Sequence, residues 1–473
     1  MNSVSTTINV QSRADSLIGI ADSATQGTVS AMEIQDRPIL RSGEALETVL
    51  SVIITQHAGG GKANQYFLRG FNLDHGTDFA IFFDGMPLNL PSHAHGEGYA
   101  DMNTVIPEFV ERVDYEKGPY AADVGNYGSA GSAHLVFFKT LPQNFFTVEG
   151  GMFGYGRAVF GVSQKLGSGS LVYGGEVLHD DGPWKHPDDY YKFTGFLTYS
   201  RGADAEGFSI TARAYQGKWN SSDQIADNAV PLAGFFGTLN QTDGGNSQRY
   251  SLQAEWHRQG ANSETKIMAY GFYYDLDLSS DFTYFLTDPI RGDQFEQQDR
   301  RWVTGVDAHH TIFSHWFGRK VENTFGLQVR NDWINNGLYQ TENRVRLDKT
   351  DSSTGNTLSA TTEADRFSDT QVGFYAKNKI QWAEKFRTVA ALRGDLEYFD
   401  VTSLVTPANS GTASKFLPSP KLSLIFGRGP IRSSMYRADS VFTATMGVAQ
   451  RKRWNRFRRK ILSPIRPSQK FPP

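Results

Sequence analysis

Two histidines and a glutamate lie close together between Asn89 and Tyr99, where the sequence reads NLPSHAHGEGY. In an extended segment His93 and His95 point to the same side, because successive side chains alternate. Imidazole and carboxylate groups suit borderline transition metals, and they would also meet an anionic chelate. A pair of histidines without a third fixed ligand is weak evidence for a metal site. The alternative is a solvated loop whose histidines only form hydrogen bonds.

Other histidines give weaker patterns. His57 and His75 resemble the pair above but lack its spacing, and His309 and His310 are adjacent in an expected strand. Neighbours in a strand face opposite sides, so those two do not share a metal. There is no Gly-x-Ser-x-Gly, phosphate-binding loop or His-Glu-x-x-His motif. With no cysteine, thiolate zinc sites and cysteine nucleophiles are also excluded. We predict no enzyme activity, no cofactor and no bound metal.

The charge is unevenly distributed. The 473 residues carry 47 Lys and Arg against 50 Asp and Glu, and this near-neutral total argues against a nucleic-acid-binding chain. Residues 428–473 hold 12 basic groups and one acid, so the preceding residues carry 35 basic and 49 acidic groups, a net charge of −14. A basic tail would bind anionic lipid, or it does not belong to the fold.

The chain divides into four parts. Residues 1–30 are small and polar and are predicted to form a flexible arm, and residues 31–142 a small α+β domain. Residues 143–427 alternate between apolar and polar, and residues 428–473 form the basic tail. The elements expected in the α+β domain are a helix then strand over Ala45–Ile54, strands at Gln65–Arg69, Phe79–Phe83 and Val113–Glu116, and a helical turn at Pro107–Val110.

Twelve alternating segments follow residue 143, each near the ~9–11 residues that cross a bilayer as a tilted strand. Connections alternate between short and long, as up-and-down strands of an outer-membrane barrel require. A soluble sandwich has no reason to sort its loops by end. The segments are Phe145–Phe153, Arg157–Lys165, Ser170–Leu178, Tyr190–Ser200, Gly207–Trp219, Gln248–Arg258, Thr265–Asp275, Arg300–Phe313, Lys320–Trp333, Asp369–Trp382, Arg387–Phe399 and Phe416–Phe426.

Four motifs, in order, resemble the plug domain of the TonB-dependent receptors of the bacterial outer membrane. They are Gln65–Phe71 (QYFLRGF), Phe83–Leu88 (FDGMPL), Pro107–Pro119 (PEFVERVDYEKGP) and Tyr127–Ala133 (YGSAGSA). The resemblance implies a plug inside a barrel of about 22 strands. The expected fold is therefore mainly β: a small α+β plug and an incomplete antiparallel up-and-down transmembrane β-barrel.

The resemblance also implies roles for particular residues. In the family the apical loops of the plug face the substrate, so the expected ligand contacts are Ser92, His93, His95, Glu97 and Tyr99. The short stretch Thr6, Thr7, Ile8, Asn9 and Val10 resembles the TonB box, which adds a strand to a partner's sheet edge. Charged groups expected to dock the plug on the wall are Arg69, Glu111, Arg112, Glu116 and Lys117.

The implied activity is active uptake of a scarce nutrient across the outer membrane, most often an iron–siderophore or another metal chelate, by a monomer driven by TonB. Two alternatives remain open at this stage: a passive porin, which would not need a folded plug, and a secreted β-rich binding protein. The start of the chain shows no signal peptide.

The tail departs from the family pattern, in which a final strand closes the barrel. A shift of reading frame near Phe426–Arg428 would explain the lost alternation, the charge reversal and the missing strands together, and the product would be a truncated, non-functional copy. A divergent basic tail is the alternative. Twelve strands alone would leave two open edges, which lipid does not tolerate.

Overall fold

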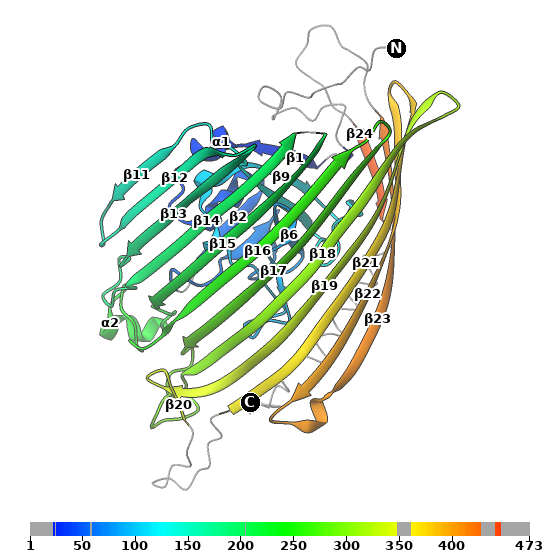
Figure 1. Ribbon diagram of the computed structural model, residues 1–473. Helices are drawn as coiled ribbons and strands as arrows, with labels where there is room; N and C mark the ends of the chain where they lie inside the picture. The colour runs from blue at the N-terminus through cyan, green and yellow to red at the C-terminus, as the bar shows by residue number, and fades with distance from the viewer. Residues whose placement is uncertain are drawn as a thin grey trace.

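The protein is described by a computed structural model covering residues 22–23, 25–56, 59–203, 205–347, 361–426 and 440–445, the last range by its backbone only. One large curved antiparallel sheet holds a smaller α+β domain against its concave face (Figure 1). His57 and the TonB-box stretch Thr6–Val10 lie outside the described residues.

The plug is built on a five-stranded sheet in the order β1-β9-β10-β5-β6. Its strands are β1 Gln26–Ser30, β5 Phe79–Phe83, β6 Met86–Pro87, β9 Val110–Lys117 and β10 Gly131–Phe137. The β5–β10 pair is parallel and the other pairs are antiparallel. Because β1 pairs with β9, the plug sheet begins before the predicted boundary at residue 31, and residues 26–30 are not part of a flexible arm.

Short elements complete the plug, and those at Val52–Thr55, Gln65–Leu68 and Pro107–Phe109 match segments expected from the sequence. Helix α1 begins with a capping box in which Ser30 and Glu33 satisfy each other's backbone N–H groups. The remaining elements are α1 Ala31–Gln35, η2 Ser42–Thr48, β2 Val52–Thr55, β3 Gln65–Leu68, β4 Phe71–Asn72, β7 Leu90–Pro91, β8 Gly98–Tyr99, η3 Met102–Thr104 and η4 Pro107–Phe109.

All twelve predicted long strands are present, in sequence order across the sheet. They are β11 Phe145–Gly150, β12 Gly156–Leu166, β13 Gly169–Asp180, β14 Tyr190–Ala203, β15 Glu206–Asn220, β16 Gly244–Gln259, β17 Ser263–Ser280, β18 Phe295–Trp316, β19 Arg319–Glu342, β21 Thr361–Ala383, β22 Phe386–Ser403 and β23 Gly411–Phe426. Ser440–Thr445, within the predicted basic tail, pairs with β23 as strand β24. The alternation of apolar and polar residues therefore predicted the position and order of these strands correctly.

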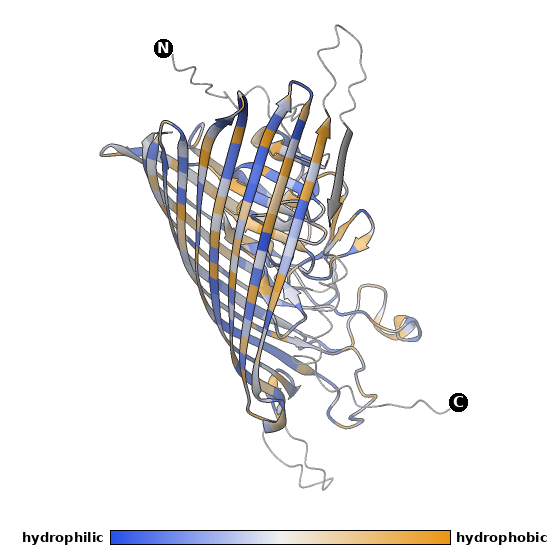
Figure 2. Ribbon diagram, turned by 90° about the vertical axis from the view of Figure 1, so that its right-hand side faces the viewer, coloured by the Kyte–Doolittle hydropathy of each residue, from blue (hydrophilic) through white to orange (hydrophobic). Residues whose placement is uncertain are grey.

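Apart from β11, which is shorter, the strands are longer than predicted, reaching 24 residues in β19. A row of paired aromatic residues crosses the outer face: Tyr250 pairs with Tyr273, Tyr273 with Trp302, and Trp302 with Trp333. Such a row is typical of a membrane interface. The apolar and polar residues alternate along the strands (Figure 2). The predicted segments match the membrane-crossing part, and the strands continue beyond the aromatic row.

Connections are sorted by end. Residues 167–168, 260–262, 317–318 and 384–385 form short turns, whereas 181–189, 221–243, 281–294 and 343–360 form longer connections at the opposite end. The connection 404–410 is shorter than predicted because β22 and β23 extend into it. The long connections carry the small elements η5 Asp227–Ala229, α2 Val230–Ala233, β20 Val345–Arg346 and η6 Pro407–Asn409, and α2 and β20 lie at the lower end in Figure 1. Among the described residues, no helix has the length and apolarity needed to cross a membrane.

The plug and the sheet share one hydrophobic core. Plug residues such as Phe83 and Phe109 are fully buried together with inward side chains of the wall, including Phe196, Phe272 and Val303. Phe109 lies with its ring centroid 4.9 Å from that of Phe196. Apolar burial on this scale stabilises the assembly at about 25 cal/mol per Å². The plug is therefore packed against the wall as a core, and polar contacts then fix its orientation.

Candidate functional site

The segment Asn89–Tyr99 forms a folded loop on the plug. Strands β7 and β8 close its ends, because Leu90 pairs with Tyr99 and Pro91 with Gly98. Ser92 adopts a left-handed backbone conformation with φ of 52°, which turns the chain out of β7. The loop is thus held at its base and presents residues 92–97 to the concave wall.

Two neighbouring strands of the wall bind the loop's backbone. Arg301 in β18 donates from Nη1 to the Pro91 carbonyl at 2.7 Å. Asp299 Oδ2 accepts from the Ala94 backbone N–H at 3.1 Å, and Arg330 in β19 donates to the Asn89 carbonyl at 2.8 Å. The loop therefore docks on β18 and β19 in part through its main chain.

His93 is a buried, neutral side chain. Its ring stacks on Tyr99 with centroids 4.1 Å apart and planes 5° apart. Nε2 lies 3.9 Å from Asp299 Oδ2, but Asp299 already binds Arg301 through both oxygens at 2.7 Å. Burial lowers the pKa of His93 well below its usual 6.5, and the nearby Arg301 lowers it further. His93 and Asp299 therefore do not form an ion pair.

His95 is held by the wall and by a third histidine. Its Nδ1 lies 2.9 Å from Gln297 Oε1 in β18, and its ring meets that of His75 edge-on with centroids 4.6 Å apart. Burial lowers the pKa of His95 well below 6.5, with Lys62 and His75 adding to the effect. His75 Nδ1 in turn donates to the Ala63 carbonyl at 2.9 Å. The three imidazoles pack together, and burial disfavours the charged forms of His93 and His95.

The other residues expected to contact a ligand have distinct environments. The Ser92 carbonyl accepts from Arg301 Nη2 at 3.4 Å. Tyr99 is fully buried, and its hydroxyl accepts from the Ala63 N–H at 2.9 Å. Glu97 is partly exposed, and its carbonyl accepts from the Tyr127 hydroxyl at 2.8 Å. Of the five, Glu97 alone lines the large cavity between plug and wall.

That cavity has a volume of about 680 Å³. The plug contributes Asp74, Glu97 and Tyr127 to its lining, and the wall contributes Arg330, Arg393 and Lys415 from β19, β22 and β23. Its size is within the range of small-molecule sites. The wall also contributes the acids Asp307, Asp395 and Glu397, so the cavity is lined by charges of both signs, with more acidic than basic groups.

The five residues expected to dock the plug have contacts within the plug. Arg112 pairs with Asp114 at 2.9 Å and with Glu111 at 3.6 Å, and Lys117 donates to the Leu50 carbonyl at 2.9 Å. The Arg69 backbone N–H donates to the Ser51 carbonyl. Burial raises the pKa of Glu116 to about 7, partly offset by Lys421 of the wall.

Ion pairs between plug and wall come from other acids. Asp84 binds Arg213 of β15 at 2.6 Å, with both side chains only 4% exposed. Glu108 binds Arg157 of β12 through two hydrogen bonds of 2.7 and 2.8 Å. Asp84 belongs to the Asp-Gly turn found in the sequence, where it has φ of 47°. The sequence pointed to the turn, but it could not indicate Arg213, a partner 129 residues away.

A plug held inside an up-and-down antiparallel sheet, with short turns at one end and long connections at the other, defines a plugged outer-membrane β-barrel. The TonB-dependent receptor plug domain model matches residues 20–132. The TonB-dependent receptor-like β-barrel model matches residues 177–437, more than half of the chain. The chain belongs to the TonB-dependent receptor family, whose members are transporters and not enzymes.

Solved structures share the fold at low sequence identity. The copper transporter OprC is 17% identical with a TM-score of 0.64, over 88% of this chain and 62% of that one. The ferric citrate transporter FecA in its unliganded form is 14% identical with a TM-score of 0.68, over 88% and 61%. The siderophore receptor PiuA from Acinetobacter baumannii is 15% identical with a TM-score of 0.66, over 86% and 62%. The chain thus spans about three fifths of the length of these structures.

Proposed function

We propose that this protein takes part in TonB-dependent uptake of a scarce nutrient, an iron–siderophore or another metal chelate, across the bacterial outer membrane. The observation that carries the proposal is the plug seated on the concave face of the barrel sheet by buried ion pairs. A plug fixed in this way blocks passage, so substrate entry needs mechanical work on the plug. The outer membrane holds no ATP, and the energy would come from TonB acting on the N-terminal arm.

The substrate class is inferred from the structural neighbours. They are a copper transporter, a ferric citrate transporter and a siderophore receptor. The cavity presents basic groups on Arg330, Arg393 and Lys415 that an anionic chelate would contact, among a larger number of acidic groups. We assign ligand contact to Glu97, which lines the cavity, and a supporting role to Ser92, His93, His95 and Tyr99, which pack within the same loop.

Dependence on TonB is the first test. In cells expressing the receptor, deletion of Thr6–Val10 is expected to abolish uptake of a labelled ferric chelate while leaving its binding to the cells unchanged, because the deletion removes the proposed TonB contact and none of the cavity residues named above. Uptake that persists in the deletion variant, or in cells lacking TonB, would instead identify a passive porin.

Ligand contact is tested separately. His93→Ala with His95→Ala is expected to lower chelate affinity at least about tenfold, as loss of a supporting shell commonly does. His310→Ala is the matched control, because His310 lies in β18 and bonds Thr265 away from the plug. Unchanged binding by the double variant would remove these residues from the site.

A further inference from the structure

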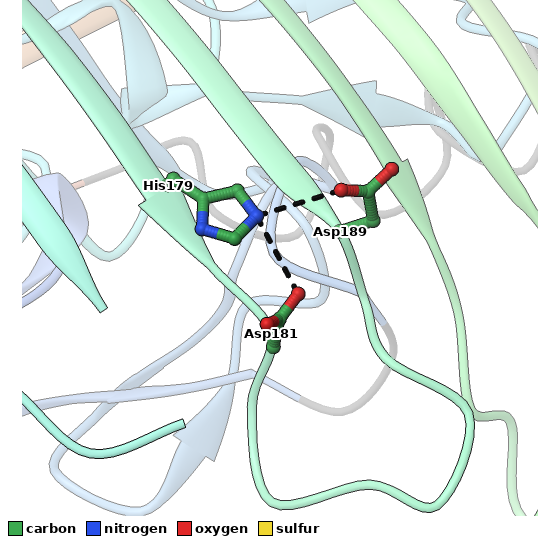
Figure 3. Close-up of side chains that lie close together, drawn as sticks. All are labelled: His179, Asp181 and Asp189. Carbon is green, nitrogen blue, oxygen red and sulfur yellow. Dashed lines mark ion pairs between the residues drawn. The ribbon is translucent and has the colours of Figure 1, made fainter. Parts of the chain in front are cut away.

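A second group of metal-ligating side chains lies away from the plug. His179 ends strand β13, and Asp181 and Asp189 begin and end the connection to β14 (Figure 3). One ligand atom from each residue lies within 4.8 Å of the other two. Among the described residues this is the one group of three or more such side chains that converges in this way. It lies at the end of the barrel with the long connections.

The distances fit a metal better than a direct ion pair. His179 Nε2 is 3.4 Å from Asp181 Oδ1 and 3.4 Å from Asp189 Oδ1. Charge-assisted N–H···O bonds are usually about 2.7–2.9 Å long, so both contacts are too long for strong ones. Two ligand atoms about 2.1 Å from a tetrahedral zinc ion lie about 3.4 Å apart. The distance from the imidazole nitrogen to each carboxylate oxygen therefore equals the distance between two ligand atoms of a tetrahedral zinc site.

The imidazole is oriented for coordination by a residue outside the group. His179 Nδ1 lies 3.0 Å from the Gly154 carbonyl in the β11–β12 turn. A carbonyl can only accept, so Nδ1 carries a proton, and in a metal-bound form the lone pair of Nε2 would face the ion between the carboxylates. This arrangement, with the second ring nitrogen bound to a backbone carbonyl, is the usual support of a metal-bound histidine.

The backbone of both connections is built around the group. The Asp181 N–H donates to the Phe153 carbonyl, and the Asp188 N–H donates to the Asp181 carbonyl, each at 2.9 Å. Gly154 has φ of 69°, and a Cβ there would collide with the Asp181 carboxylate. Asp189 also has a positive φ, 44°, which is uncommon for a residue with a side chain. These constraints hold the three side chains toward one point.

We propose that His179, Asp181 and Asp189 bind one divalent first-row transition-metal ion, of which Zn²⁺ is the reference case. The imidazole favours such a metal over Ca²⁺ and Mg²⁺, which prefer oxygen ligands alone. The side chains are 27%, 34% and 56% exposed, so water can reach the fourth position. The bound ion clamps the β13–β14 connection to the β11–β12 turn. This site is separate from the plug and from the proposed uptake.

The test is a titration of the full chain in detergent with ZnCl₂ and no other ligand. Calorimetry measures how many Zn²⁺ ions bind and how tightly. One equivalent is expected to bind, and His179→Ala and Asp189→Asn are each expected to weaken binding at least about tenfold. The matched control is His309→Ala, because His309 has similar exposure and a single carboxylate, Asp307, at 3.7 Å. The control is expected to bind as the wild type does, and excess Mg²⁺ is not expected to displace the ion.

X-ray absorption at the zinc edge of the wild type provides a readout that does not depend on the folding of variants. Four nitrogen and oxygen neighbours near 2.0–2.1 Å, one of them an imidazole, are expected. No saturable Zn²⁺ binding, equal binding by His179→Ala, or a zinc spectrum without imidazole would each overturn the proposal. None of these readouts involves TonB or a nutrient, so failure here leaves the proposed uptake untouched, and the reverse also holds.

Discussion

His93 and His95 have neutral rings in this fold because the groups around them do not compensate a positive charge. Arg301 and Lys62 oppose protonation, and the nearest carboxylate, Asp299, is already bound by Arg301. A polar loop is ordinarily solvated, but here the wall replaces water through Gln297 and the backbone contacts. The chemical behaviour of the two histidines is therefore set by burial and not by their spacing in the sequence.

This neutrality predicts a pH dependence. Below pH 6.5 the unfolded chain takes up protons on these histidines and the folded chain does not, so the free energy of unfolding falls as pH falls, by up to about 1.4 kcal/mol per pH unit for each histidine. Burial raises the pKa of Asp101 to about 6 and so acts in the opposite direction. The comparison of variants isolates the histidine contribution.

His93→Phe keeps the stacking on Tyr99 but removes the titrating group, and it is expected to reduce the loss of stability between pH 7 and pH 5. Tyr99→Phe is the control, because it removes the hydroxyl bonded to Ala63 and lowers stability at every pH without changing the slope. Urea unfolding of both variants at several pH values measures this. Equal slopes for His93→Phe and the wild type would contradict the assignment.

At the scale of elements, the β5–β6 turn of the plug contacts strands β15 and β16 of the wall and so positions the plug. The turn between β5 and β6 places the Asp84 carboxylate against Arg213, and the Asp84 carbonyl accepts from Gln253 of β16 at 2.9 Å. Arg213 also lies over the ring of Phe137 at 4.5 Å. One turn of the plug therefore binds two adjacent wall strands: β15 through the buried Asp84–Arg213 ion pair, and β16 through the hydrogen bond from Gln253.

Breaking this pair should be costly. Arg213→Ala leaves the buried Asp84 charge with the more distant Lys139, at 3.8 Å, in place of its close partner, and a loss of about 3–5 kcal/mol in the free energy of unfolding is expected. Arg300→Ala is the matched control, because Arg300 is 47% exposed and its pairs with Asp275 and Asp277 are worth at most about 1 kcal/mol. Urea unfolding followed by tryptophan fluorescence compares the two, and equal losses would show that the Asp84–Arg213 pair does not hold the plug.

At the scale of the whole molecule, the aromatic row and the alternation of the strands define an apolar belt. On the outer face of β16, Tyr250 and Trp256 flank Leu252 and Ala254. Beyond Tyr250, toward the long connections, the outer face becomes polar at Asn246. The same change occurs on β17 and β18, where Asp275 and Arg300 follow the aromatic row. The membrane therefore crosses the short-turn part of the sheet.

The belt predicts a depth-dependent effect of charge. Leu252→Arg is expected to cost about 2–4 kcal/mol in lipid bilayers, whereas Asn246→Arg, on the same face but beyond the aromatic row, is expected to cost about 0–1 kcal/mol. Unfolding by denaturant in lipid vesicles measures both. Equal costs for the two substitutions would place the bilayer elsewhere on the sheet.

Local patterns carried much of the architecture. Alternation along residues 145–426 specified the strands and their faces, because a strand has a period of two whatever its neighbours are. The Asp84-Gly85 turn was likewise evident, since its positive φ values favour those residue types. The plug motifs also identified the domain, although pairing of β1 with β9 could not be seen in so short a polar stretch.

The sequence by itself thus determined the strand-rich sheet, the order of its strands and the presence of a plug. Only the tertiary structure decided which groups meet, because contacts such as Asp84 with Arg213 and His95 with Gln297 join residues 129 and 202 positions apart. It also decided that the histidine loop is buried, and that His179 lies with Asp181 and Asp189 beside Gly154. Burial and such distant pairings depend on the curvature of the sheet around the plug, which no local pattern encodes.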